Sequence, residues 1–408
     1  MDNIVVALFA LTYLGMAAGR IPGLKMDRTG IALVAAVVVV AIGVLPREKL
    51  ADAVHFPTLL LLAGLMVLSA RFGAAGIYER VTIWIARRTE KPIQLLGLTV
   101  FVGGGLSAVL VNDIVVFAMT PLLCVSVASR GLDARPYLFG LAAASNAGSA
   151  ATLIGNPHNI IIGQVGNLDF WDYAIFAALP TGVALVVVFL CILLVWRKSL
   201  SKDVRPVELE LPPLNVAETA FCVVALALLL VLFATPLPRE ISALLVAGGL
   251  MLSRKIPSRR LLDEIDAPLL ILFASLFVVN AAFATTGIPQ MAATRLADTG
   301  ISISSILILP FVSLVASNTI GNVPAVMILL EAWPILDGKT LTALAIFSTL
   351  AGNLLLVGSL VNIIVAERAL VHGVRLTFAD HARAGIPITL STMLFAGLWL
   401  WCWGYSGF

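Results

Sequence analysis

Apolar segments long enough to cross a lipid bilayer follow one another along the whole of this 408-residue chain. Hydrophobic residues make up 60% of it and charged residues only 12%, whereas a soluble domain carries roughly 45–50% and about 25%. A bilayer core about 30 Å thick requires roughly 20 apolar residues per helix. We therefore predict an all-α integral membrane protein with about ten transmembrane helices. The predicted passes are 4–20, 29–46, 56–72, 136–163, 173–196, 216–234, 240–253, 266–284, 340–367 and 384–405.

Two further apolar stretches, 92–128 and 301–336, are too long for one pass and are interrupted by polar residues. The interruptions are Asn112-Asp113 in the first stretch and residues 318–322 in the second. A polar break at mid-membrane depth is tolerated only where it faces protein or a wet cavity. We therefore predict two re-entrant helical hairpins, each of which returns to the side from which it entered.

The distribution of Lys and Arg predicts the orientation in the membrane. If neither hairpin crosses, the 26 basic residues sort 21 to 5 between alternate sets of loops. Positive charge marks the cytoplasmic side, so we predict a multi-pass protein of the inner (plasma) membrane with both termini outside the cytoplasm. A basic chain that binds nucleic acid would not sort its charge in this way, and we expect no nucleic-acid partner.

An internal repeat relates the two halves of the chain. Shifting the sequence by 211 residues places 46–77 over 257–288, with thirteen of 32 positions identical. The pass at 29–46 is predicted to run outward and its partner at 240–253 inward, so the halves are inverted. The identical pairs include Pro46/Pro257, Asp52/Asp263, Pro57/Pro268 and Gly76/Gly287.

The repeat defines the predicted domains: a first repeat over 1–196, a cytoplasmic linker over 197–215 and a second repeat over 216–408. Each repeat holds one hairpin and one discontinuous helix, the latter at 136–163 and 340–367. Inverted repeats whose broken helices meet at mid-membrane are typical of secondary transporters. A channel is the structural alternative, which the repeat alone does not exclude.

Asp113 is the residue of the first hairpin tip that most needs an explanation. It is the only acidic residue between Lys91 and Asp133, and a charged side chain at mid-membrane costs at least ~2.5–3.5 kcal/mol. We interpret Asp113 and its neighbour Asn112 as part of a substrate or ion site, with Asp113 carrying a transported ion or proton. The alternative is that Asp113 only caps the second helix of the hairpin.

The break in the first discontinuous helix is rich in polar and small residues. Pro157 prevents a smooth helix, and helix N-termini that point into the resulting gap favour anions. Packing of small residues between helices is the alternative explanation, but it accounts poorly for the asparagines. His158 adjoins the break as a weaker candidate. The candidate binding residues are Ser145, Asn146, Gly148, Ser149, Thr152, Gly155, Asn156 and Asn159.

The second half offers the matching candidates. Asn318 and Asn322 lie at its hairpin tip, and Glu331 is expected at the outer end of that hairpin. His55, His372 and His381 fall in predicted loops and are expected to be solvated. No nucleotide-binding or protease motif is present, so we expect no enzyme activity. The second broken helix supplies Asn353, Gly358, Ser359 and Asn362.

At these motifs the chain resembles the ion transporter superfamily, which includes arsenite permeases, divalent anion/sodium symporters and NhaD-type sodium/proton antiporters. The resemblance rests on VNDIVVFAMTP, SNAGSAATLIGNPHNIIIG, GNVPAVMILL and VGSLVNIIVAE, and it is strongest to the YbiR-like anion-permease branch. It implies a scaffold domain, often dimeric, and a transport domain that contains both hairpins and both broken helices. It also implies that Asn112 and Asn322 are the tip asparagines.

The hairpin tips of this chain depart from the Ser-Asn-Thr triplets of the dicarboxylate symporters. This departure argues against a sodium site near Asn112 and Asn322. The presence of Asp113 favours protons as the coupling ion. The first hypothesis is therefore a proton- or sodium-coupled carrier of a small anion, oxyanion or metalloid. Arsenite-type efflux is its most specific form, with a separate ATPase subunit as a partner in an arsenite pump. The alternatives are a sodium/proton antiporter and a passive anion channel. No cofactor other than a sodium ion is expected.

Overall fold

The computed structural model describes residues 2–18, 24–89, 91–201, 213, 215–252, 256–298, 304–333 and 336–404. Most of the predicted linker, 202–212 and 214, lies outside them. The first half contains α1 (Asp2–Ala18), α2 (Arg28–Ala41), η1 (Arg47–Lys49), α3 (Leu50–Ala53), α4 (Phe56–Ala74), α5 (Ile77–Arg88), α6 (Pro92–Val109), α7 (Asn112–Ala128), α8 (Arg135–Ser149), α9 (Pro157–Val165) and α10 (Phe170–Val195). The second contains α11 (Val216–Leu232), α12 (Arg239–Met251), α13 (Ser258–Asp263), α14 (Ala267–Ala284), α15 (Ile288–Asp298), α16 (Ile308–Ile320), α17 (Asn322–Ala332), α18 (Gly338–Ala351), η2 (Leu356–Gly358), α19 (Leu360–Val371) and α20 (Phe378–Cys402).

The described residues form helices and no strand, which confirms the predicted all-helical membrane fold. By length and composition, the part of the chain that the structure describes holds five helices able to cross a membrane, namely α4, α6, α10, α14 and α20. Several other predicted passes are shorter helices. In particular, residues 136–163 form α8 and α9, which are separated by an irregular bend, and residues 340–367 form α18 and α19 in the same way.

The helices of the two halves follow the same order, and equivalent helices begin in the same way. His55 and Asp266, 211 positions apart, are the N-caps of α4 and α14, and each side chain accepts a hydrogen bond from the first turn. Gly76 and Gly287 precede α5 and α15 with φ of +74° and +67°. Only glycine adopts this left-handed conformation without strain, which explains why both halves keep it.

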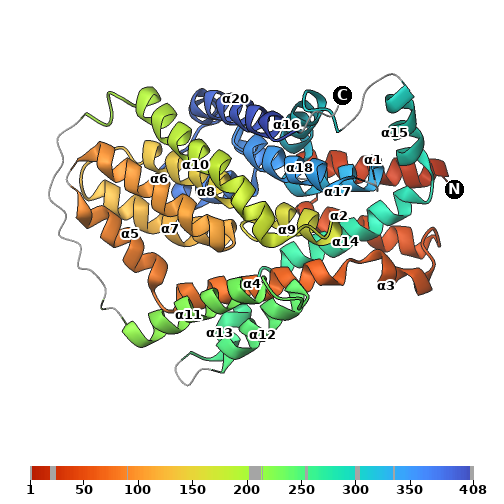
Figure 1. The fold of residues 1–408 in the computed structure, drawn as a ribbon, viewed down its shortest axis with the longest axis horizontal. Coiled ribbons are helices and arrows are strands. Elements are labelled where there is room, and N and C mark those ends of the chain that lie inside the picture. Colours follow the sequence, from red (N-terminus) through yellow and green to blue (C-terminus); the bar gives the residue numbers. More distant parts are fainter. Residues whose placement is uncertain are drawn as a thin grey trace.

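The helices divide into two packed groups. The first group, which we call the frame, consists of α1, α2, α4, α11, α12 and α14. In the frame, α2 of the first half packs on α14 of the second half, and α12 of the second half packs on α4 of the first. Figure 1 shows α4 with α11, α12 and α13 along one edge of the molecule. The second group, which we call the site helices, consists of α6–α10 and α16–α20.

The base of the first hairpin is fixed by Arg130, one of the 26 basic residues that the charge count assigned to loops. Arg130 follows α7 but is only 3% exposed. Its guanidinium donates hydrogen bonds to the carbonyl oxygens of Ala86 and Thr89 at the end of α5. A basic side chain interacts favourably with the last carbonyls of a helix, so Arg130 joins the hairpin to α5.

Candidate functional site

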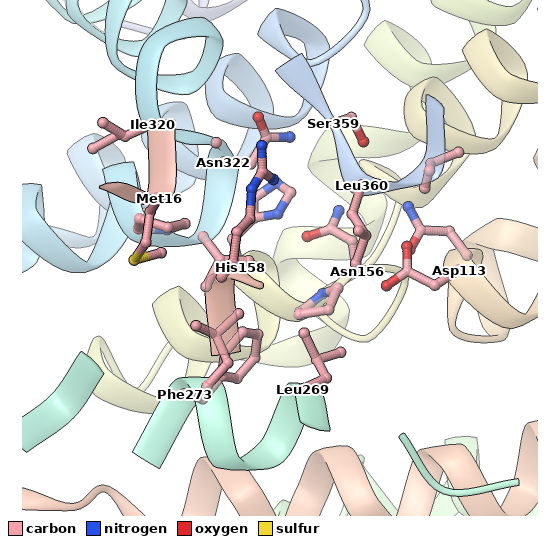
Figure 2. A pocket seen from close by; sticks show the side chains of 18 of the residues that line it. Met16, Asp113, Asn156, His158, Leu269, Phe273, Ile320, Asn322, Ser359 and Leu360 are labelled. Atoms are coloured by element: carbon pink, nitrogen blue, oxygen red, sulfur yellow. The ribbon is translucent and has the colours of Figure 1, made fainter. Parts of the chain in front are cut away.

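Four helix N-termini converge on one cavity between the frame and the site helices. Helices α7 and α17 begin at the two hairpin tips, and α9 and α19 begin at the two bends. Figure 2 shows Asp113, Asn156, Asn322 and Ser359, one from each of these starts, around the same space. Because the first N–H groups of a helix have no partner within it and carry partial positive charge, the cavity is suited to oxygen-rich or anionic ligands.

The first hairpin tip is held by the bend that lies opposite it. The backbone N–H of Asn112 donates to the carbonyl oxygen of Gly155 at 3.1 Å, and its side-chain Nδ2 lies 3.4 Å from Ser149 Oγ. Within the described residues, Asn112 Oδ1 is buried without a hydrogen-bond partner. A buried polar atom of this kind normally has a partner, and because Asn112 lines the cavity its oxygen is available to accept a hydrogen bond from a molecule there.

The second tip shares the unpartnered amide oxygen with the first but is held to its bend by a different asparagine. Gly321 has a φ of +94°, which turns the chain between α16 and α17 and places Asn322 at the start of α17. Asn322 Oδ1 is also buried without a partner among the described residues. Asn318 instead lies one turn back and donates to the carbonyl oxygens of Leu314 and Ala351, both at 2.9 Å. It supports the tip and does not line the cavity.

The two bends are joined by side-chain amides that cross from one repeat to the other. Asn146 Nδ2 donates to Asn353 Oδ1 at 2.9 Å and to Asn362 Oδ1 at 3.1 Å. Ser359 Oγ donates to Asn146 Oδ1 at 2.8 Å. All four side chains are buried. The cluster joins the last turn of α8 to the second bend and the start of α19, and it leaves Asn146 and Ser359 at the cavity wall.

Thr349 is a central residue of the site that the sequence reasoning missed. Its Oγ1 accepts from Asn156 Nδ2 at 3.2 Å, donates to Asn159 Oδ1 at 3.1 Å and lies 2.9 Å from His158 Nε2. The pairing of Asn159 with Asn362 in the repeat gives an offset of 203, which aligns Thr349 with Asn146. This offset is the signal that would have identified it.

Three titratable or charged side chains face the cavity: Asp113, His158 and Arg28. Asp113 comes from the predicted tip. Arg28 begins α2 in the frame and was expected to be a loop cation, but it lies opposite the second tip, with Nη1 4.0 Å from the position that a Cβ of Gly321 would occupy. The cavity therefore receives a positive charge from the frame and a carboxyl group from the site helices.

The rest of the frame side is apolar. Met16 of α1 and Leu269, Leu272 and Phe273 of α14 line it, and Figure 2 shows Leu269 and Phe273 opposite Asn156 and His158. The side of the cavity formed by the site helices is polar, and the side formed by the frame is largely apolar. Two such surfaces make few hydrogen bonds with each other. Such a boundary opposes relative movement less than a hydrogen-bonded one.

His381, expected to be solvated, is instead buried in α20, with Nε2 3.1 Å from the carbonyl oxygen of Asn353.

The residues predicted to bind the substrate or ion divide into two sets. The cavity is lined by Asn112, Asp113, Asn146, Asn156, Asn322 and Ser359. The others lie behind it in the tips and bends: Ser145, Gly148, Ser149, Thr152, Gly155, Asn159, Asn318, Asn353, Gly358 and Asn362.

Comparison with known proteins gives concordant matches over most of the chain. The family described as citrate transporter (CitMHS) matches residues 13–333. The 46 kDa membrane protein of Mycobacterium leprae is 29% identical over 98% of both chains. The silicon efflux transporter LSI3 of Oryza sativa subsp. japonica is 25% identical over 91% of both chains. The Alcanivorax borkumensis YdaH transporter, whose topology is described as unusual, shares the fold with a TM-score of 0.56 at 14% identity, covering 98% of this chain and 97% of its own.

Proposed function

The chain belongs to the citrate transporter family (CitMHS) of the ion transporter superfamily, and on that premise we propose that it is a proton-coupled carrier of a small oxyanion. It works by alternating access in the inner (plasma) membrane, with both termini outside the cytoplasm. The convergence of four helix N-termini on one cavity is the observation that carries this proposal. Broken helices in transporters direct their positive ends at the anionic group of the substrate.

The charges in the cavity support coupling to protons. When Asp113 is ionised, its negative charge opposes that of Arg28. When Asp113 is protonated, the positive charges of Arg28 and the four helix starts act on the ligand unopposed. An anion therefore binds together with a proton, and by linkage each strengthens the binding of the other. Binding of an anion should consequently increase as the pH falls.

A neutral metalloid hydroxide is the second candidate, and arsenite-type efflux is its most specific form. The unpartnered oxygens of Asn112 and Asn322 favour it, because they accept hydrogen bonds from hydroxyl groups. One relative is named a silicon efflux transporter, and dissolved silicon and arsenite are both largely neutral hydroxides near neutral pH. A hydroxyl donor prefers the ionised carboxylate of Asp113, so binding of such a solute should increase as the pH rises.

The variant Asp113→Asn tests the coupling. Asparagine is uncharged at every pH, so flux of a neutral probe through the variant in proteoliposomes should be independent of pH between about 5.5 and 8.5, and flux of an anionic probe should follow only the titration of the probe itself. Flux through the unaltered protein should change more steeply than that. Phosphate and citrate are the anionic probes, and arsenite and silicic acid the neutral ones. A helix cap would be replaced well by asparagine. An unchanged pH profile in Asp113→Asn would therefore refute the coupling role.

His158→Gln is the matched control, because His158 is the other titratable group of the cavity besides Arg28. Glutamine keeps a side-chain hydrogen-bonding group near Thr349 and removes only the titration. The steep pH profile should survive in this variant.

A sodium/proton antiporter, the alternative function, would use the oxygens of Asn112 and Asn322 to bind sodium. It would exchange sodium for protons with none of the four probes present.

A further inference from the structure

We propose that Arg28 and Arg239 are a symmetry-related pair that exchange roles as the protein alternates between its two states. In each state one arginine binds the C-terminus of α9 or α19, the second segments of the two broken helices, while the other arginine faces the cavity. The inference rests on the proposed function, because it requires two states. The two arginines would stabilise the two states and would supply the positive charge of the cavity in each of them.

The two arginines occupy equivalent positions in the repeat. They are 211 residues apart, and each is the first residue of its helix, α2 or α12. Both helices belong to the frame, where α2 packs on α14 and α12 packs on α4. Both side chains are half-buried. Because the halves are predicted to be inverted, one arginine lies toward each side of the membrane.

Arg239 contacts the site helices directly. Its Nη2 donates to the carbonyl oxygen of Gly163 at 2.7 Å, and that carbonyl also accepts from the N–H of Leu168 at 3.1 Å. This second bond closes the C-terminus of α9, where Asn167 has a φ of +46°. A cation at the negative end of a helix is favoured, and the bond joins frame to site helices on this side.

Arg28 makes no such bond in this state. Among the residues that the structure describes, no hydrogen bond or ion pair reaches its side chain, which lines the cavity opposite the second tip. Its expected acceptor nevertheless exists. The C-terminus of α19 is closed as that of α9 is: the N–H of Val374 donates to the carbonyl oxygen of Ala369 at 3.0 Å, and Gly373 has a φ of +76°. Although α19 is three residues longer than α9, Ala369 holds the same place in the C-terminal turn of α19 that Gly163 holds in that of α9.

The exchange follows from applying the inverted repeat to these contacts. In the opposite state the site helices shift along the frame, Arg239 releases Gly163, and Arg28 donates to the carbonyl oxygen of Ala369. Arg239 then faces the cavity in place of Arg28. The bound solute consequently meets one frame arginine in both states, so an anion is not left without its counter-charge at the end of the movement.

The populations of the two states can be read with a pair of equivalent cysteines. Leu272 lines the cavity and is half-buried, while its counterpart Leu61, 211 residues earlier, is 1% exposed and belongs to α4, which packs on α9 and α7. Leu272→Cys or Leu61→Cys is introduced after the native cysteines are replaced by serine. The labelling rate with a small thiol reagent is then measured in proteoliposomes without any solute, so the result does not depend on the substrate.

Opposite shifts are the expected result. Arg239→Gln removes the charged hydrogen bond from α12 to the end of α9 and leaves the neutral-donor bond from Gln164 to Glu240 in place, so it should slow labelling at Leu272→Cys and accelerate it at Leu61→Cys. Arg28→Gln should do the reverse. A hydrogen bond from a charged group shifts an equilibrium by roughly 10- to 100-fold, which sets the scale of both effects. Lysine at either position keeps the charge and should restore most of the original ratio, which excludes misfolding.

Lys25→Gln and Arg47→Gln are the matched controls, because each removes a positive charge from an exposed position near α2 or α3. Both should leave the ratio of the two labelling rates unchanged. Shifts of the same sign for Arg28→Gln and Arg239→Gln, or no shift from either, would overturn the exchange. A failure of every probe to be transported would count against the proposed function and leave the labelling result standing.

Discussion

Asn112→Ala and Asn322→Ala are each expected to lower transport by one to two orders of magnitude while leaving the protein folded. The two asparagines begin α7 and α17 at equivalent points of the repeat, line one cavity and each present a buried amide oxygen without a partner among the described residues. A hydrogen bond to a charged ligand contributes roughly 1.5–3 kcal/mol, so losing one tip should lower flux by about 10- to 100-fold.

The fold should tolerate both changes because few contacts within the protein depend on these side chains. Among the described residues, the side chain of Asn112 makes one long hydrogen bond, 3.4 Å from Nδ2 to Ser149 Oγ, and alanine keeps the backbone bond to Gly155. Flux is measured in proteoliposomes at matched protein content, with the exposed Asn3→Ala as the control for an asparagine outside the cavity. Normal flux in either tip variant would show that the tips do not bind the solute.

Gly148→Ala is expected to destabilise the protein severely. A Cβ at Gly148 would lie 2.1 Å from the carbonyl oxygen of Gly104 in α6, and its other near neighbours are also backbone atoms of Gly104. Because backbone cannot rotate aside as a side chain can, α6 and α8 would have to separate along their contact. Overpacking of a buried site typically costs 1–3 kcal/mol and occasionally more, and this contact should lie at or above roughly the upper value.

Gly182→Ala in α10 is the matched control, since a Cβ there meets nothing within 4 Å. Alanine in place of glycine within a helix should stabilise by roughly 0.5–1 kcal/mol. The thermal unfolding midpoint is measured in detergent by tryptophan fluorescence. It should be lower for Gly148→Ala than for the unaltered protein, and unchanged or higher for Gly182→Ala. Equal midpoints for the two variants would contradict the close approach of α6 and α8.

The architecture was predictable because it depends on patterns that the bilayer enforces along the sequence. Long apolar segments and the 211-residue repeat predicted a helical membrane protein, and the family match and the described helices confirm the superfamily and that fold. The pairs His55/Asp266 and Gly76/Gly287 show why the repeat was visible. A helix cap and a left-handed turn restrict residue type, so they persist where lipid-facing positions vary.

The composition of the cavity was only partly predictable, because it depends on how the frame meets the site helices. Asn112 and Asn322 were found from the repeat. Arg28 was not, since its basic side chain at a helix start is also typical of a solvated loop, and only the packing of α2 on α14 brings it to the cavity. Thr349 could be found only through the 203-residue offset that aligns it with Asn146, and His381 has no distinctive sequence context. Their roles depend on His158 and Asn353, which other helices and the second bend supply.

The most direct test of the central claim is whether an imposed proton gradient drives a solute uphill. Proteoliposomes that contain the purified protein are loaded with equal phosphate or citrate on both sides and then given a pH step. We predict accumulation on the more alkaline side, into which protons flow, abolished by a protonophore and absent from Asn112→Ala vesicles. Phosphate and citrate that only equilibrate, whatever gradient is imposed, would contradict a proton-coupled oxyanion carrier and indicate a passive channel.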